Sequence, residues 1–305
     1  MKVLITGAGG NLGRVLAPAL VERGHEPIMM DYRSIETSYP FIQGDITNKT
    51  DVLRAAEGVD AIVHAAALHG IHLSKYTRDD FWTLNVQGTY NVYEAARQYG
   101  VSKILLCSTM GVYGESIREV PDSFAKVTED LPLLAGDFYG ESKVLCEHIA
   151  QFYSRKDHIQ TIAYRLGMFV PESYLNYGIR LLKGGVDDRD VAQAFILGLE
   201  NSTIDFDVFN IMSDVPFSEN EFTRWRKEPL ALMEERFPGF AELMLQHGEE
   251  PENLLRRWGY TYWSIDRAKE RLGYKPNYNF PEFYAALKDN NNNHYPYANL
   301  PWWGM

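Results

Sequence analysis

The sequence predicts an α/β fold in which a doubly wound parallel sheet is followed by a small, mostly helical C-terminal lobe. Three observations predict it. Short apolar runs alternate with amphipathic stretches in the first half of the chain, a glycine-rich turn follows the first apolar run, and the pattern changes after about residue 213. Apolar strands separated by helices are typical of βαβ units, whose parallel sheet is covered by helices on both faces.

The individual elements follow from the same patterns. The expected strands are residues 2–6, 27–30, 61–64, 103–107 and 161–165. The clearest expected helices are 11–23, which Gly24 closes, and 139–155. We expect residues 1–212 to form the sheet domain, with 266–288 as a candidate to return to it. Residues 213–305 would then form a smaller helical substrate or cap lobe and an aromatic tail, which we expect to pack on the body or on a second subunit.

The composition excludes several classes of protein. The chain has 305 residues, 45% hydrophobic and 23% charged, as in ordinary globular proteins. A net charge of −11 disfavours nucleic acid as a partner. No apolar run is long enough to cross a membrane, and the first residues lack a signal-peptide pattern. The two cysteines, Cys107 and Cys146, lack metal-ligand spacing and are expected to be reduced thiols. We therefore expect a cytoplasmic protein.

The strongest motif lies between Thr6 and Gly13. Its glycines, Gly7, Gly10 and Gly13, have the spacing T-G-x-x-G-x-x-G and come directly after the first strand. Glycine there permits a tight turn, close approach of the backbone to a pyrophosphate, and close packing of helix on strand. Asn11 and Leu12 open the following helix, whose free N–H groups favour phosphate. The motif predicts a dinucleotide-binding Rossmann domain.

Acidic residues after the second strand indicate which dinucleotide binds. Asp31, followed by Tyr32, stands where a carboxylate would accept hydrogen bonds from the adenosine ribose and repel a 2′-phosphate. This favours NAD over NADP, although Arg33 lies close by. Asp45, followed by Ile46, could bind the adenine edge or could equally be a helix cap or turn residue.

A second motif points to catalysis. Tyr139 and Lys143 are four residues apart and so lie on one face of a helix. A nearby ammonium would lower the pKa of the phenol, which could then exchange a proton with a hydroxyl during hydride transfer. Ser108 and Thr109 follow a strand and could both hydrogen-bond the oxygen of a substrate.

Together these motifs resemble the extended short-chain dehydrogenase/reductases, the NAD-dependent epimerase/dehydratase family. The resemblance covers about residues 1–191 and implies that Thr109, Tyr139 and Lys143 are catalytic. It also implies that the His64-Ala65-Ala66-Ala67 segment and Asn85 lie on the nicotinamide side of bound NAD. Such proteins often dimerise through two helices per subunit, here the helix around 81–98 and the helix that bears Tyr139.

One stretch is similar to uronate dehydrogenases in particular. Arg165-Leu-Gly-Met-Phe-Val-Pro171-Glu172 matches their pattern R-I-G-x-x-x-P-E, and the connection that follows is short in both. Those enzymes bind the carboxylate of a sugar acid with an arginine, for which Arg180 is the candidate here; a solvated helix face is its other interpretation. His69 and His72 are further candidate substrate contacts. Because no acid or cysteine cluster accompanies them, we expect no metal site.

Three functions remain open at this point. The first is an NAD-dependent oxidoreductase acting on a hydroxyl of a sugar or sugar acid. The second is a nucleotide-sugar epimerase, an isomerase that retains NAD. The third is a non-catalytic NAD-binding regulator, since a fold alone does not prove activity. The short connection after Arg165 favours the first, and the intact Thr109, Tyr139 and Lys143 set argues against the third.

Overall fold

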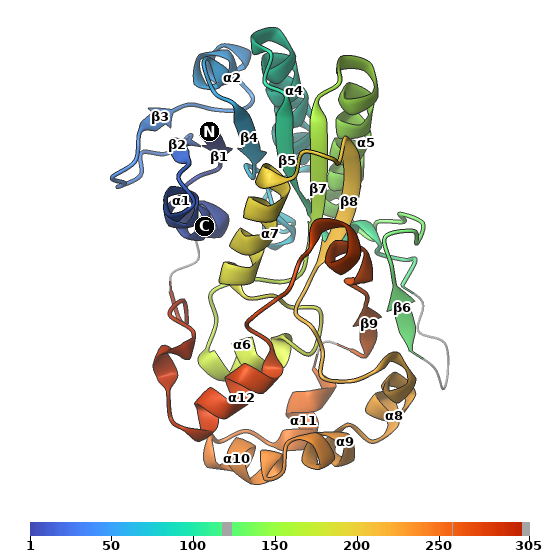
Figure 1. Cartoon of the computed structure of the whole chain (residues 1–305). Coiled ribbons are helices and arrows are strands. Elements are labelled where there is room, and N and C mark those ends of the chain that lie inside the picture. Colours follow the sequence, from blue (N-terminus) through green and yellow to red (C-terminus); the bar gives the residue numbers. More distant parts are fainter. Residues whose placement is uncertain (118–123, 258, 301–305) are drawn as a thin grey trace.

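The computed structural model describes residues 1–117, 124–257 and 259–300 (Figure 1). Within them, seven parallel strands form one sheet in the order β3-β2-β1-β4-β5-β7-β8. These strands are β1 (Lys2–Thr6), β2 (Glu26–Asp31), β3 (Phe41–Gln43), β4 (Ala61–His64), β5 (Lys103–Thr109), β7 (Gln160–Leu166) and β8 (Phe206–Ile211). The expected Rossmann-type α/β fold is confirmed.

Helices cover both faces of this sheet because its strands are apolar on both sides. One face carries α1 (Asn11–Glu22) and α7 (Asp188–Glu200). The other carries α2 (Lys49–Ala56), α4 (Gly88–Tyr99) and α5 (Phe138–Asp157). Successive residues of β5 point to opposite faces, so Leu105 joins the first core and Leu106 the second.

The strand order creates a crevice. The chain runs outward from β1 to β3 and then crosses back to β4 on the other side of β1. Where the strand order reverses in this way, the loops after neighbouring strands separate, and ligands bind at the carboxyl ends of the strands. The crevice therefore lies where β1 and β4 end.

A helical lobe lies beyond the carboxyl ends of the strands, in the lower half of Figure 1. Its helices are α6 (Tyr174–Arg180), α8 (Phe222–Lys227), α9 (Pro229–Arg236), α10 (Phe240–Gln246), α11 (Pro251–Arg256) and α12 (Phe280–Lys288). They enclose a separate aromatic core that includes Trp225 and Phe283. Lobe and sheet domain alternate along the chain, because α6 precedes residue 213 and Ile265 and Leu272 pack in the core of the sheet domain.

The aromatic tail packs on the body over the part that is described. The ring of Tyr295 stacks on Tyr177 of α6, with centroids 3.8 Å apart. Its hydroxyl donates to Asp188 Oδ2 (2.8 Å), and the Arg14 guanidinium lies 4.8 Å from the ring of Tyr297. Residues 301–305, which complete the predicted aromatic tail, lie outside the described residues.

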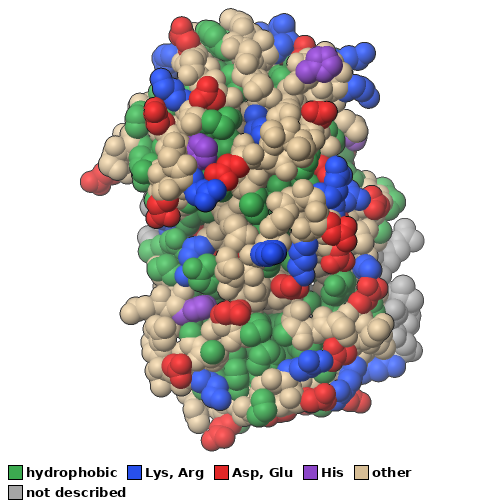
Figure 2. All heavy atoms as spheres, in the orientation of Figure 1, with side chains coloured by type: hydrophobic (Ala, Val, Ile, Leu, Met, Phe, Trp, Pro, Cys, Tyr) green, Lys and Arg blue, Asp and Glu red, His purple; other side chains and the backbone are tan. Residues whose placement is uncertain are grey.

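Charged side chains of both signs are interspersed over the face seen in Figure 2, and hydrophobic side chains gather over its lower, helical part. The net charge of −11 therefore does not form a single acidic patch on this face. In the part of the chain that the structure describes, no helix is both long and apolar enough to cross a membrane.

Candidate active site

A cavity of about 800 Å³ opens at the carboxyl ends of β1, β2, β4, β5 and β7. Most of the residues that the sequence singles out line it. They are Gly7, Gly10, Asn11, Leu12, Asp31, Tyr32, Asp45, Ile46, Ala65, Ala66, Ala67, His69, His72, Ser108, Thr109, Tyr139 and Lys143. The other four, Gly13, His64, Asn85 and Arg180, are outside its lining.

The glycine turn at one end of the cavity is shaped as a cradle. Gly7 has a φ of 67°, and a Cβ there would lie 2.6 Å from Ala66 Cα. A Cβ on Gly13 would lie 2.1 Å from the carbonyl oxygen of Ala8, so Gly13 serves helix packing and does not face the cavity. Because α1 begins at Asn11, its free N–H groups end at this cradle. The turn can hold a pyrophosphate without a side chain in the way.

Asp31 is held in place at the end of β2. Its side chain is only 6% exposed, and its two oxygens accept hydrogen bonds from the N–H groups of Gly9 (3.0 Å) and Arg33 (3.1 Å). The Arg33 guanidinium is more distant, with Nε 4.0 Å from Oδ1. A fixed carboxylate beside the glycine turn suits the hydroxyls of an adenosine ribose.

Asp45 has the turn contact that one of its two interpretations predicts, and the contact with adenine stays a prediction. Its Oδ1 accepts the N–H of Thr47 (2.8 Å), which is a turn contact. Its side chain is nevertheless exposed and lines the cavity together with the buried Ile46. The turn contact therefore leaves the second carboxylate oxygen available to a ligand.

Two predicted cofactor contacts brace the cavity from behind. His64 is buried and bridges Thr6 Oγ1 (2.8 Å) and Thr89 Oγ1 (3.0 Å) through its two ring nitrogens. Burial, assisted by the charge of Lys143, lowers the pKa of His64 to about 3, so the ring is neutral. Asn85 is also buried, and its amide exchanges hydrogen bonds with the backbone of Leu68 (2.7 and 3.0 Å). Both side chains are outside the lining of the cavity and brace its wall, and their place on the nicotinamide side of bound NAD stays a prediction.

The catalytic candidates meet at the other end of the cavity. Thr109 ends β5, and its hydroxyl lies close enough to the phenol of Tyr139, on the first turn of α5, to lower the pKa of that phenol. Lys143 follows one turn later and donates from Nζ to the Cys107 carbonyl (2.9 Å). Gly140 allows this close approach, because a Cβ there would lie 2.6 Å from the carbonyl oxygen of Gly111.

The pKa of Tyr139 differs from the sequence-based expectation. Burial raises it to about 12, and the nearby Thr109 hydroxyl only partly offsets this effect. The ring is packed among aromatic neighbours, with centroids of His69 and Phe81 at 5.9 and 6.4 Å. Since the Lys143 ammonium is directed at the Cys107 carbonyl, the phenol is protonated at neutral pH in this arrangement.

The predicted substrate contacts divide into two groups. His69 is exposed on the cavity wall next to Tyr139, and the N–H of His69 donates to His72 Nδ1 (2.8 Å), which fixes this loop. Arg180, in contrast, is fully buried in the lobe, where it pairs with Glu172 and donates to the Val186 carbonyl (3.3 Å). Arg180 is therefore neither on a solvated helix face nor at the cavity, and a carboxylate there could not reach it.

Sequence reasoning missed part of the wall. Met110, Tyr76, Asp80, Phe169 and Val170 also line the cavity. Phe169 and Val170 come directly after β7, and the rule that ligands bind where strands end could have identified them. Tyr76 and Asp80 belong to the long connection after β4, which carries no comparable signal. Within the described ranges, no three His, Cys, Asp or Glu side chains come together as a metal site requires.

Comparisons with known proteins identify the family of the chain. The family model "NAD dependent epimerase/dehydratase family" matches residues 3–174. The chain is 28% identical to uronate dehydrogenase of Pseudomonas syringae pv. tomato over 231 residues, 68% of this chain and 77% of the relative. It is 29% identical to UDP-glucose 4-epimerase of Corynebacterium glutamicum over 160 residues, 50% and 47% of the two chains.

Among solved structures, the fold is similar to that of a short-chain dehydrogenase/reductase superfamily protein from Agrobacterium tumefaciens with bound NAD. The TM-score is 0.69 at 19% identity, over 95% of this chain and 98% of that one.

Proposed function

Because the chain belongs to the NAD-dependent epimerase/dehydratase family, we propose that it oxidises a hydroxyl group of a free sugar or sugar acid with NAD as the hydride acceptor. One observation carries the proposal. Thr109, Tyr139 and Lys143 lie in the same cavity as the glycine turn and Asp31, so a single extended ligand could occupy both ends. The similarity to a uronate dehydrogenase supports the class of substrate.

The residues of the chain fit the cofactor. The glycine turn and the first N–H groups of α1 would hold the pyrophosphate, and Asp31 would hold the ribose hydroxyls of the adenosine. NAD, when bound, supplies a nicotinamide ring that accepts hydride. Ala65 and Ala66 bring backbone close to the cradle, and their small side chains leave the cavity open.

Each catalytic side chain has a separate task. Thr109 orients the substrate oxygen through its hydroxyl, and Tyr139 takes up the proton that leaves this oxygen. Lys143 is the cation whose approach to the phenol would stabilise the phenolate. Because burial raises the pKa of Tyr139 to about 12, oxidation should accelerate as pH rises toward that value, whereas the reverse reduction finds the phenol already protonated.

His69 and His72 are the proposed substrate contacts in this end of the cavity. The His69 side chain is exposed on the wall beside Tyr139, and a neutral imidazole can donate or accept a hydrogen bond with a sugar hydroxyl. Ser108 remains a proposed contact as well, although its hydroxyl already donates to Glu147 (2.5 Å). Arg180 is withdrawn as a carboxylate ligand because Glu172 neutralises it inside the lobe.

The test is a screen of the purified protein with NAD against free aldoses, uronic acids and nucleotide sugars, following absorbance of NADH. Accumulation of NADH with a free sugar or sugar acid is expected, and a Tyr139→Phe protein should lose it while still binding NADH. If Tyr139→Phe keeps full turnover, the mechanism is wrong.

A nucleotide-sugar epimerase is the second candidate, favoured by the matched UDP-glucose 4-epimerase. The same three catalytic residues serve both reactions, because an epimerase removes a hydride and returns it. A changed sugar without accumulated NADH, together with NAD that stays bound through purification, would establish this alternative.

Two properties of the whole molecule are also proposed. A homodimer is supported by α4 and α5, which expose Tyr90, Tyr99 and Phe152 on the sheet domain. A cytoplasmic location is supported by Cys107 and Cys146, which are buried free thiols. Light scattering after size-exclusion chromatography tests the first, and Phe152→Glu should yield a monomer.

A further inference from the structure

One face of α5 contacts the end of β5 at three successive turns. Tyr139, Lys143 and Glu147 are spaced four residues apart and therefore share this face. Tyr139 meets the Thr109 hydroxyl, Lys143 meets the Cys107 carbonyl, and Glu147 accepts the Ser108 hydroxyl at 2.5 Å. The first two belong to the proposed reaction, and Glu147 is outside the lining of the cavity.

Glu147 is paired with Arg165 from the neighbouring strand. Arg165 Nε donates to Glu147 Oε1 (3.0 Å) and Nη2 donates to Oε2 (2.7 Å), and both side chains are about 5% exposed. Ser108 and Arg165 are direct partners across β5 and β7. Glu147 therefore joins α5, β5 and β7 at one buried point.

Arg165 also contacts the segment that follows Thr109 in the chain. Its Nη1 donates to the hydroxyl of Tyr113 (2.9 Å) and to the carbonyl of Glu129 (3.0 Å). The Tyr113 hydroxyl in turn donates to Asn210 Oδ1 on β8 (2.6 Å). The ion pair thus holds the residue immediately before Thr109 and a residue four positions after it.

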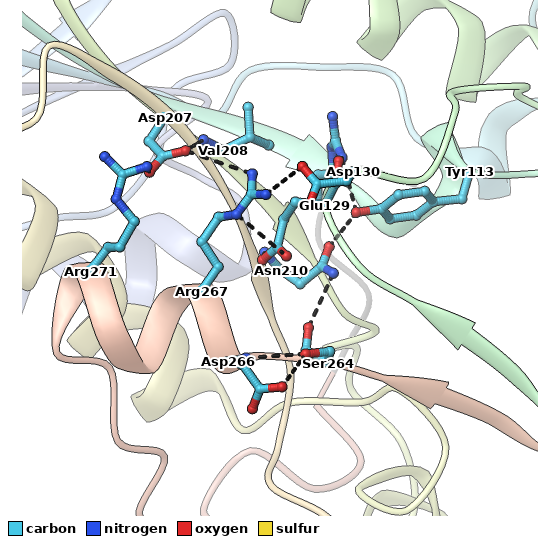
Figure 3. A network of polar contacts seen from close by, with 11 residues as sticks. Tyr113, Glu129, Asp130, Asp207, Val208, Asn210, Ser264, Asp266, Arg267 and Arg271 are labelled. Atoms are coloured by element: carbon cyan, nitrogen blue, oxygen red, sulfur yellow. Dashed lines mark hydrogen bonds and ion pairs between the residues drawn. The ribbon is translucent and has the colours of Figure 1, made fainter. Parts of the chain in front are cut away.

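Figure 3 shows how the Tyr113 hydroxyl and its partner Asn210 are connected to the rest of the fold. The Asn210 side chain accepts from the Tyr113 hydroxyl at Oδ1 and donates from Nδ2 to the Ser264 carbonyl (3.2 Å), and its backbone N–H donates to Glu129 Oε1 (2.8 Å). Arg267 lies beside both Glu129 and Asp207. Tyr113 is therefore fixed by groups from β8 and from the segment after β9 (Thr261–Trp263), and cannot shift without disturbing them.

We propose that Glu147 and Arg165 are positioning residues, which fix the catalytic hydroxyl of Thr109 by clamping Ser108 and Tyr113 on either side of it. A buried ion pair is weak as a source of stability, because the desolvation of two charges offsets their attraction. The pair is instead placed where a turn must be held: Thr109 is followed by Met110 and Gly111, and the Gly111 N–H returns to Thr109 Oγ1 (3.1 Å). This inference rests on the proposed catalytic role of Thr109.

The variant that tests it is the double substitution Glu147→Gln with Arg165→Met. Changing one partner alone would leave an uncompensated buried charge and could unfold the chain, whereas removing both charges is tolerated in buried pairs. The control is Asp187→Asn with Arg189→Met, because this pair (2.7 Å) also has a buried carboxylate but lies at the start of α7, and neither residue lines the cavity.

The first measurement needs no substrate. Hydrogen exchange followed by mass spectrometry should show loss of protection in 109–114 for the Glu147→Gln/Arg165→Met protein, and not for the control protein. Unchanged exchange in this segment, or an equal loss throughout the chain, would overturn the proposal. If the loss is seen but no protein turns over any sugar, the positioning stands and the proposed function fails.

The second measurement uses a substrate identified by the NADH screen. The double substitution should lower kcat about 100-fold, as misplacement by about 1 Å can do, with little change in KM or in NADH affinity. Adding Thr109→Ala should then lower kcat no further than Thr109→Ala alone does, because the pair acts through this hydroxyl. Full additivity of the two effects, or a change in KM only, would overturn the proposal.

Discussion

Replacing Gly140 by alanine should separate Tyr139 from Thr109 without changing either side chain. A Cβ at this position would lie 2.6 Å from the carbonyl oxygen of Gly111 and 3.0 Å from the Cβ of Ala135. Close carbon–oxygen contacts ordinarily measure about 3.3–3.6 Å, so the first turn of α5 would have to retreat by roughly 0.7–1 Å. Tyr139 is on this turn and Thr109 is not, so the retreat opens the distance between them.

The expected result has a stability part and a kinetic part. Overpacking of this kind costs about 1–3 kcal/mol, and each kcal/mol lowers Tm by roughly 2–4 °C in a chain of this order of size. Misplacement of Tyr139 should lower kcat about 100-fold while leaving the binding of NADH nearly unchanged. Thermal denaturation, fluorescence titration with NADH and turnover of the identified substrate measure these quantities.

Gly136 provides the matched control. It precedes α5 by two residues, and a Cβ there would meet only Gly114 Cα at 3.9 Å, an ordinary contact. Gly136→Ala should therefore leave both Tm and kcat close to those of the unsubstituted protein. If Gly140→Ala behaves like Gly136→Ala, then the close approach of α5 to the turn after β5 does not control the geometry of the site.

Three further predictions concern charge and pH. Asp31→Ser should weaken NAD binding about tenfold, as loss of a charged hydrogen bond does, and should reduce the preference for NAD over NADP. Titrations with both cofactors that give an unchanged ratio of the two Kd values would contradict the assignment of the ribose site. The kcat/KM for oxidation should rise from pH 7 to 9 because burial raises the pKa of Tyr139 to about 12, and a pH profile that falls over this range would count against Tyr139 as the base. Burial raises the pKa of Asp190 from 3.8 to about 7, so the protonated carboxyl stabilises the fold fully below pH 4. This contribution to the free energy of unfolding is lost as pH rises to 7, by roughly 1 kcal/mol per pH unit. Asp190→Asn should flatten the pH dependence of the free energy of unfolding between pH 4 and 7, measured by denaturant titration, and an unaltered slope would refute the assignment.

Residues whose role depends on backbone shape were predictable from the sequence. Gly7 needs a positive φ, and Asp31 ends a strand, so spacing after an apolar run was enough to locate both. Tyr139 and Lys143 share a helix face by simple periodicity. The glycine turn, the carboxylate at the end of β2 and the shared helix face therefore followed from local pattern, whereas the proposed catalytic role of Tyr139 and Lys143 came from the family resemblance.

Residues whose role depends on a distant partner were not predictable in the same way. Arg180 was expected at the substrate, but its partner Glu172 turns it into the lobe. The pKa of Tyr139 depends on His69 and Phe81, which approach it from other elements and desolvate the phenol. Neither a buried ion pair nor the degree of desolvation leaves a spacing signal in one sequence, because both arise only when separate elements pack.

The bracing residues explain how the cavity can keep its shape although polar side chains line its wall. Behind the wall, buried polar side chains tie one element to another: neutral His64 ties Thr6 to Thr89, and Asn85 ties the Leu68 backbone to the Ser142 hydroxyl on α5 (2.8 Å). A buried polar group without its partner costs about 1–3 kcal/mol. Conformations that break one of these hydrogen bonds are therefore rarely populated. The site residues can therefore hold one geometry before any ligand arrives, which is the condition under which fixed dipoles stabilise a transition state without reorganising.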